Sequence, residues 1–328
     1  MQQVTTKPWQ VILSEGFASS KALLAFLGLS EQHASIQAEQ LFKTRVPRGF
    51  AACMKRGDLN DPLLRQVLAV QDELVLTAGF TKDPLDEAAC NPVPGLIHKY
   101  HGRVLLTVTG ACAVHCRYCF RRHFPYEANN PGRAGWQKAF DYIRANQSIE
   151  EVILSGGDPL IASDLILKFL LDGLSAIPHV NTLRIHTRLP VVLPERVDNS
   201  LCGLLRASRF KVVVVLHANH ANELSDDVMA ACTALRDAGC VLLNQSVFLD
   251  GVNHEASTLI ALSKRLWACG VLPYYLHVLD KVEGAAYFNV SIEKAKAAHE
   301  ILSEQLQGYL VPRLVGEVPG GKNKQNVL

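Results

Sequence analysis

Hydrophobic and polar positions follow two different patterns along this chain. In the first hundred residues, apolar side chains recur at spacings of three and four within 19–28, 33–42 and 61–75, which predicts helices. From Arg103 onward, the pattern changes to short runs rich in β-branched and aliphatic residues, which predict strands. These strands begin near Arg103, Glu151, Thr182, Lys211, Val241 and Pro273. After the first interval, they therefore recur about every 30 residues.

Helical patterns fill the intervals between the strands, as at 163–176, 222–238 and 255–269. Each is long enough to cross back over a sheet, so the chain is predicted to repeat a βα unit. Six such units, with a candidate seventh strand at 309–315, favour a partly closed parallel barrel. A doubly wound open sheet is the alternative. In both architectures, the chemistry belongs where the strands end and the following loops converge.

The change of pattern also predicts two parts of the chain. Residues 1–95 form a helical N-terminal region, and residues 96–328 form the barrel together with a C-terminal tail. Within that tail, Lys324 follows a Pro-Gly-Gly turn that begins at Pro319. Such a turn is also typical of a solvated terminus.

Composition and charge narrow the function. Residues of the AVILMFWYC set make up 48% of the chain and charged residues 20%, as in folded globular proteins. A net charge of +2 is too small to recruit nucleic acid, so a small-molecule ligand is expected. No apolar stretch approaches the roughly 18 residues of a membrane span, and the N-terminus lacks the basic segment of a signal peptide. These features predict a cytoplasmic protein.

Three of the nine cysteines lie together directly after the first predicted barrel strand. Cys112, Cys116 and Cys119 have a C-x3-C-x2-C spacing, which suits three corners of an iron–sulfur cube. No fourth cysteine follows locally, so one iron is expected to be open to a ligand. A zinc site, with His115 or His123 as a fourth ligand, is the alternative. The six scattered cysteines are predicted to be small buried hydrophobic residues.

The cysteine triad, with Tyr118 before its last member, resembles the signature of radical S-adenosylmethionine enzymes, whose fold is a partial (β/α)6 TIM-like barrel. This resemblance implies a [4Fe–4S] cluster whose open iron binds S-adenosylmethionine. The second predicted strand runs into Gly156-Gly157-Asp158, which resembles the methionine-binding motif of that family with aspartate in place of glutamate. In the same way, Gln245 resembles a contact to the methionyl part of the cofactor.

A second resemblance, to the lysine 2,3-aminomutases, extends over about 45–324 and rests on 119–123, 244–247 and 273–280. Those enzymes also use pyridoxal 5′-phosphate, which they hold covalently on a lysine five residues after a Pro-Gly turn. Counting from Pro319 reaches Lys324, with Lys322 as the alternative. The resemblance further assigns Arg103 and Lys99 to the ring and phosphate of pyridoxal phosphate.

The same resemblance implies the substrate contacts. Arg121 matches the arginine that receives the substrate carboxylate, a task suited to a guanidinium group. Asp280 and Glu317 match acidic partners of the substrate side-chain ammonium. Two carboxylates around one cation favour lysine over neutral amino acids, because an unpaired ammonium is costly to desolvate.

The closest resemblance is to a bacterial subgroup that makes (R)-β-lysine from (S)-α-lysine. A dedicated ligase then attaches the product to elongation factor P. The resemblance therefore implies lysine as substrate, an electron donor for the cluster, and a functional link to elongation factor P and its ligase. Two alternatives remain open: an aminomutase for another amino acid, and a noncatalytic iron–sulfur or zinc module with four protein ligands.

Overall fold

The fold is a single nine-stranded sheet whose strands follow the order of the chain. A computed structural model describes residues 7–129, 132–318, 320–321 and 323–327. Neighbouring strands pair in parallel from β2 to β8, and the edge strands β1 and β9 pair antiparallel. The strands are β1 (Leu96–Tyr100), β2 (Arg103–Thr109), β3 (Glu151–Gly156), β4 (Thr182–Thr187), β5 (Lys211–His217), β6 (Val241–Val247), β7 (Leu272–His277), β8 (Arg313–Gly316) and β9 (Gln325–Asn326).

This topology confirms the parallel α/β barrel type predicted from the sequence. A doubly wound sheet reverses its strand order near the middle, whereas here the order runs from β1 to β9 without a reversal. The candidate seventh strand is present as β8, shorter than the predicted 309–315 because residues Gly308–Leu310 form a turn of 3₁₀-helix. The two antiparallel edge strands were not predicted. Strand β9 is only two residues long, and β1 directly follows an irregular segment, so no change of pattern marks where it begins.

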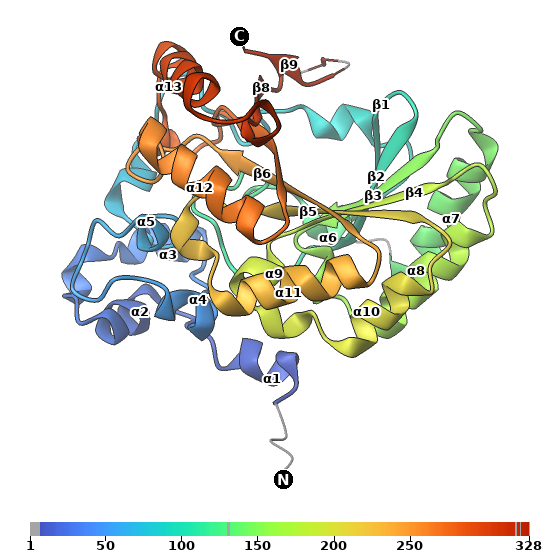
Figure 1. Cartoon of the computed structure of the whole chain (residues 1–328), viewed down its shortest axis with the longest axis horizontal. Helices are drawn as coiled ribbons and strands as arrows, with labels where there is room; N and C mark the ends of the chain where they lie inside the picture. The colour runs from blue at the N-terminus through green and yellow to red at the C-terminus, as the bar shows by residue number, and fades with distance from the viewer. Residues whose placement is uncertain (1–6, 130–131, 319, 322, 328) are drawn as a thin grey trace.

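Helices cover the outside of the sheet between successive strands (Figure 1). In the barrel they are α6 (Tyr126–Asn129), α7 (Gly132–Ala145), α8 (Asp164–Ser175), α9 (Leu189–Val192), α10 (Asn199–Arg206), α11 (Asp226–Asp237), α12 (Ala256–Ala268) and α13 (Ile292–Gln305). Short 3₁₀ turns lie at Pro159–Ile161, Pro194–Arg196, Ala221–Glu223, Ala286–Phe288 and Gly308–Leu310. The helical patterns at 163–176, 222–238 and 255–269 therefore match α8, α11 and α12. No described helix combines the length and the apolar character that a membrane crossing needs.

Local sequence signals explain these elements. The side chain of Ser225 accepts a hydrogen bond from the Val228 backbone N–H at the start of α11, with Asp226 and Asp227 in the first turn and Arg236 in the last. Strand β5, with the sequence KVVVVLH, has a nearly continuous apolar run, as expected for a parallel strand covered on both faces.

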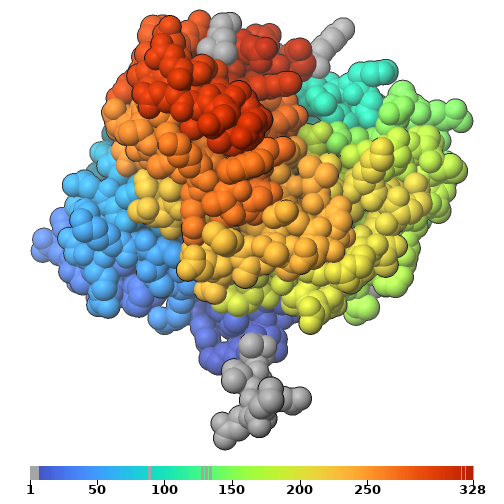
Figure 2. Space-filling view, viewed as in Figure 1, coloured from blue at the N-terminus to red at the C-terminus, as the bar shows by residue number. Residues whose placement is uncertain are grey.

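The N-terminal region consists of short helices that pack on one side of the barrel (Figure 1). They are α1 (Trp9–Ser14), α2 (Ser20–Leu27), α3 (Ile36–Leu41), α4 (Arg48–Ala52) and α5 (Pro62–Arg65), with 3₁₀ turns at Glu31–His33, Gln71–Leu74 and Glu87–Cys90. Buried residues of this region, such as Leu23 and Phe50, belong to the same hydrophobic core as the barrel helices. Figure 2 shows this blue region in continuous contact with the rest of the surface.

One predicted helix is wrong in extent. The pattern over 61–75 predicts a continuous helix, but α5 ends at Arg65 and only a 3₁₀ turn, Gln71–Leu74, follows. The intervening chain turns inward, where Gln66, Val67 and Leu68 are buried. A segment that is buried on both sides can show the same spacing of apolar residues as an amphipathic helix. The spacing alone therefore does not distinguish the two structures.

A buried carboxylate joins the N-terminal region to the loop that follows β2. Both oxygens of Glu73 accept hydrogen bonds from Arg117, at 2.8 and 2.5 Å, and one of them also accepts from Arg122 at 2.7 Å. These three side chains are at most 3% exposed. Because both arginines come from the cysteine loop, the N-terminal region holds that loop in place through this anion.

We expect Glu73→Gln to destabilise the fold by about 3–5 kcal/mol, because it leaves two buried guanidinium groups without their anion. Asp172→Asn is a matched control, since the ion pair of Asp172 with Lys168 on α8 is exposed and worth about 0.5 kcal/mol or less. Chemical denaturation of both variants measures the difference. Equal, small losses for the two variants would show that Glu73 does not hold the loop.

Candidate functional site

A cavity of about 270 Å³ opens at the carboxyl ends of the parallel strands. Every site residue predicted from the sequence lies in its lining: Lys99, Arg103, Cys112, Cys116, Cys119, Arg121, Gly156, Gly157, Asp158, Gln245, Asp280, Glu317 and Lys324. In the sequence, these residues extend from Lys99 on β1 to Lys324 near the C-terminus, and they lie on or after several of the strands between. The fold therefore brings the predicted residues together, and their individual roles toward cofactors stay predictions.

The cysteine loop lies at the mouth of β2. Burial, together with the negative charges that Cys119 and Cys116 carry when ionised, raises the pKa of Cys112 well above its usual value. Burial and the charge of Cys116 raise the pKa of Cys119 to about 11. Cys112 and Cys119 are consequently protonated at neutral pH, and iron must displace their protons to bind them as thiolates.

Arg188, in the loop after β4, contacts the cysteine loop directly. Its Nη1 donates hydrogen bonds to Cys116 Sγ and to the Tyr118 hydroxyl, both at 2.8 Å. Its Nη2 donates to Glu223 at 2.9 Å and to Gln66 at 2.7 Å. A fixed positive charge therefore lies beside the sulfur of Cys116.

The described residues fit a three-cysteine cluster better than a zinc ion. His115 and His123, the two proposed fourth ligands for zinc, lie outside the cavity lining and hydrogen-bond to the backbone carbonyls of Lys43 and Glu283. Among the described residues, no three Cys, His, Asp or Glu side chains are close enough to surround a single ion. Each corner iron of a cube takes its own thiolate, so a cluster does not need that convergence.

The two glycines after β3 are required by close backbone contact. A Cβ atom on Gly157 would lie 2.3 Å from the carbonyl oxygen of Ala111, and one on Gly156 would lie 2.5 Å from that of Thr109. Gly156 also has a φ of +114°, which side-chain-bearing residues rarely adopt. Its carbonyl accepts a hydrogen bond from the Tyr126 hydroxyl at 2.7 Å. These glycines therefore set the distance between β3 and the cysteine loop.

Asp158 is engaged within the protein. Its carboxylate accepts hydrogen bonds from the Thr187 hydroxyl at 2.7 Å and from the backbone N–H groups of Leu160, Arg188 and Leu189. Burial raises the pKa of Asp158, and these donors act in the opposite direction. In this structure, Asp158 organises the loops after β3 and β4, and the neighbouring glycines offer their backbone to the cavity.

Lys324 and Glu317 face each other at the C-terminal side of the cavity. Lys324 Nζ lies 2.5 Å from one Glu317 oxygen, and Lys99 Nζ and the Tyr100 hydroxyl donate to the other oxygen at 3.2 and 3.0 Å. Burial opposes ionisation of Glu317, but these donors outweigh it and lower its pKa to about 2. Lys322, the alternative to Lys324, lies outside the described residues.

The pKa of Asp280 is shifted in the opposite direction from that of Glu317. Burial, and to a smaller extent the negative charge of Glu317, raise its pKa to about 7, although the positive charge of Lys324 acts against them. Asp280 is therefore half ionised near neutral pH, and an incoming cation would complete its ionisation.

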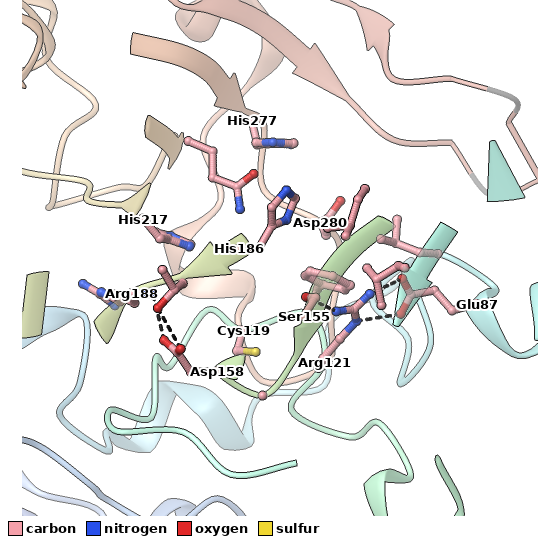
Figure 3. Close-up of a pocket in the computed structure, with 18 of the residues that line it drawn as sticks. Glu87, Cys119, Arg121, Ser155, Asp158, His186, Arg188, His217, His277 and Asp280 are labelled. Atoms are coloured by element: carbon pink, nitrogen blue, oxygen red, sulfur yellow. Dashed lines mark hydrogen bonds and ion pairs between the residues drawn. The ribbon is translucent and has the colours of Figure 1, made fainter. Parts of the chain in front are cut away.

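Arg121 is paired with a residue that the sequence analysis missed. Its Nε and Nη2 donate to the two oxygens of Glu87 at 2.8 and 2.7 Å, and its Nη1 donates to Ser155 at 3.2 Å (Figure 3). Glu87 lies in the irregular segment before β1, where no periodicity or spacing marks it.

Three histidines also line the cavity: His186, His217 and His277 at the ends of β4, β5 and β7 (Figure 3). Burial and the charge of Arg188 lower the pKa of His217 to about 3. Burial and nearby cations, including Lys324, lower the pKa of the other two well below the usual value. All three are neutral at pH 7. In the sequence, their position at the ends of predicted strands is the signal that places them at the cavity.

The cavity thus has two chemically distinct sides. Three cysteines beside a two-glycine backbone suit an iron–sulfur cluster with one open iron. Elsewhere in the same lining, a group of residues suits a phosphate-bearing aldehyde: the amine of Lys324, the basic groups of Lys99, Arg103 and Arg184, and the Tyr275 ring, whose centroid lies 5.5 Å from Lys324 Nζ.

Comparison with known proteins agrees with this arrangement. A family model described as a 4Fe-4S single cluster domain matches residues 101–185, which contain the cysteine loop and the glycine pair. The L-lysine 2,3-aminomutase of Escherichia coli strain K12 is 48% identical over 319 residues, covering 96% of this chain and 93% of that protein. That of Haemophilus influenzae is 47% identical, covering 96% and 94%. That of Methanococcus maripaludis is 36% identical, covering 98% and 75%.

The parallel barrel with a three-cysteine loop at its mouth, matched by the 4Fe-4S family, is that of a radical S-adenosylmethionine enzyme. Within that class, the chain belongs to the L-lysine 2,3-aminomutase family. It is therefore an isomerase with a [4Fe–4S] cluster and S-adenosylmethionine as cofactors, and pyridoxal phosphate is expected with them. A radical SAM methyltransferase from Sphaerobacter thermophilus aligns with a TM-score of 0.49 at 18% identity over 67% of this chain and 68% of that chain, and the assignment does not rest on it.

Proposed function

We propose that this protein is a lysine 2,3-aminomutase that converts (S)-α-lysine to (R)-β-lysine. The observation that supports this most is one cavity that holds a guanidinium group for a carboxylate, two carboxylates for an ammonium, and an amine for an aldehyde. These are Arg121, Asp280 with Glu317, and Lys324. The relatives named above carry the same activity in their names.

In the proposed mechanism, one cavity would hold both cofactors and the substrate. Cys112, Cys116 and Cys119 would hold the cluster, and Gly156, Gly157, Asp158 and Gln245 would border the space for S-adenosylmethionine. Lys324 would hold pyridoxal phosphate, and Arg103 and Lys99 would contact its ring and phosphate. When bound, the cluster and S-adenosylmethionine supply hydrogen-atom abstraction, and pyridoxal phosphate supplies a carrier for the migrating amino group.

Substrate recognition follows from charge. The α-carboxylate of lysine pairs with Arg121, and its side-chain ammonium pairs with Asp280 and Glu317. In the free protein, Glu317 is occupied by the ammonium of Lys324. With Lys324 engaged in holding pyridoxal phosphate, the Glu317 oxygen that it contacts would be available to the substrate ammonium. A glutamate substrate would bring an anion to the same place and be repelled, which separates lysine from that alternative.

The residues between the charged groups also help to exclude water from the cavity. Tyr118, Leu279 and the neutral His217 line the cavity and are buried or partly buried. Neutral histidines and apolar groups exclude competing protons and water, which a reaction through reactive carbon centres requires. The positioning of both cofactors around one cavity allows near-contact geometry at the reacting carbon.

We further propose that the β-lysine is made for attachment to elongation factor P by its ligase, in the cytoplasm, with an electron donor that reduces the cluster. The support for this role is the resemblance to the bacterial subgroup over 45–50, 61–67, 93–100 and 276–282. A noncatalytic iron–sulfur module is not favoured, because such a site needs four protein ligands and the described cavity lining holds three cysteines.

We expect the anaerobically reconstituted protein to form β-lysine from lysine when S-adenosylmethionine and dithionite are both present. Amino-acid analysis of the products measures this. Omission of S-adenosylmethionine should abolish the product. Turnover of arginine or glutamate in preference to lysine would support the alternative aminomutase activity instead.

Lys324→Ala should abolish the visible absorbance of lysine-bound pyridoxal phosphate, because it removes the amine proposed to hold the aldehyde. After borohydride treatment, the wild type should retain the cofactor covalently and the variant should not. Lys322→Ala is the matched control and should behave as the wild type. The reverse result would assign the role to Lys322.

The titration of the Asp280 carboxyl group predicts that substrate binding depends on pH. Its raised pKa of about 7 means that the carboxyl group is mostly neutral near pH 6 and mostly ionised near pH 8. The KM for lysine should therefore fall by about tenfold between about pH 6 and about pH 8, as the ionised fraction grows by that factor. Asp280→Asn should raise KM and remove this dependence. A variant that keeps the wild-type slope would show that another group titrates.

A further inference from the structure

The surroundings of Arg121 leave a defined part of its guanidinium group open. Three of its five N–H groups are used: Nε and one on Nη2 by Glu87, and one on Nη1 by Ser155. Within the described part of the chain, one N–H on each of Nη1 and Nη2 has no hydrogen-bond partner. Two terminal nitrogens with a free N–H each match the two oxygens of a carboxylate.

The faces of the same group are covered as well. The Arg121 Cζ atom lies 4.9 Å from the centroid of the Phe120 ring and 5.8 Å from that of the Phe124 ring. The aromatic rings restrict the tilt of the guanidinium plane, and Glu87 restricts its rotation within that plane. Arg121 is 8% exposed, so the open N–H groups are directed to the cavity rather than to bulk water.

The backbone that presents Glu87 is itself unusual. Asp86, directly before Glu87, has a φ of +51°. Among the described residues, no other non-glycine residue has a positive φ. This conformation costs free energy, and the surrounding structure maintains it where it starts the 3₁₀ turn Glu87–Cys90. The result is a glutamate that is 8% exposed, with both oxygens on Arg121.

We propose that Glu87, assisted by Ser155, is a positioning residue for substrate specificity. It holds Arg121 so that the two terminal nitrogens face the cavity and bind the α-carboxylate of lysine in a bidentate manner. This inference rests on the proposed function, because it assumes that Arg121 receives that carboxylate.

Glu87 is not placed as a competitor for the substrate. A carboxylate that mimics the substrate would occupy both terminal nitrogens, whereas Glu87 takes the side of the guanidinium formed by Nε and Nη2. The substrate carboxylate and Glu87 can therefore bind Arg121 at the same time.

The test compares lysine with 1,5-diaminopentane, which has both amino groups and lacks the carboxylate. Calorimetry on the protein carrying its cluster and pyridoxal phosphate, without S-adenosylmethionine, gives a Kd for each compound. In Glu87→Gln, the Kd of lysine should rise by about tenfold to a hundredfold, as expected for a lost charge-assisted hydrogen bond. The Kd of the diamine should stay within about twofold, since Glu87 acts only through the carboxylate contact.

Ser155→Ala keeps the buried ion pair intact and should shift the lysine Kd in the same direction by a smaller factor, which keeps the test valid if Glu87→Gln folds poorly. Glu300→Gln, an exposed glutamate on α13, is the matched control and should change neither Kd. Tighter lysine binding in Glu87→Gln would make Glu87 a competitor. An unchanged lysine Kd, or equal weakening of both compounds, would also overturn the proposal.

Arg121→Gln separates this inference from the proposed function. If Arg121→Gln weakens lysine binding selectively while Glu87→Gln does not, only the role of Glu87 fails. If Arg121→Gln leaves the preference for lysine over the diamine unchanged, the proposed substrate arrangement itself fails.

Discussion

Each guanidinium group buried beside the cysteine loop requires a carboxylate, and this requirement connects the parts of the molecule. An unpaired buried charge costs several kcal/mol, so the arginines and their partners must fold together or not at all. The pairs are Arg117 with Glu73, Arg121 with Glu87, and Arg188 with Glu223. Two of the three carboxylates come from the N-terminal region, and the third follows β5. The cysteine loop is thereby held from both sides.

The same constraint divides the cavity by charge. Glu317 is kept ionised by the cations around it, whereas Asp280, a nearby carboxyl with fewer donors, titrates near neutral pH. Histidines at the strand ends are neutral because burial and the surrounding cations oppose a further positive charge. The lining therefore combines charged side chains of both signs with neutral histidines. In the proposed function, Asp280 and Glu317 favour the side-chain ammonium of lysine over neutral amino acids.

Much of the architecture was predictable, because βα repeats leave a strong local signal. Strands such as β5 are continuous apolar runs, and helices such as α11 carry both a cap and charged ends. The cysteine loop and Gly156-Gly157 were also recognisable, since their spacing reflects short-range geometry. The segment 61–75 was predicted wrongly as one helix, because burial on two sides produces the same spacing as an amphipathic helix. Edge strand β9, with two residues, is too short to leave a pattern.

By itself, the sequence determined the order of the elements and the spacing of the cysteine loop, because each of these depends on neighbours within a few positions. It also identified thirteen of the residues that line the cavity, several of them through the family resemblance. Only the tertiary structure decided how the charges are paired. Glu87 and Arg121, or Lys99 and Glu317, are separated by 34 and 218 residues, and no local pattern links them. Whether a carboxyl group is ionised, and which N–H groups of an arginine remain open, depends on desolvation and on partners that the fold alone brings into contact.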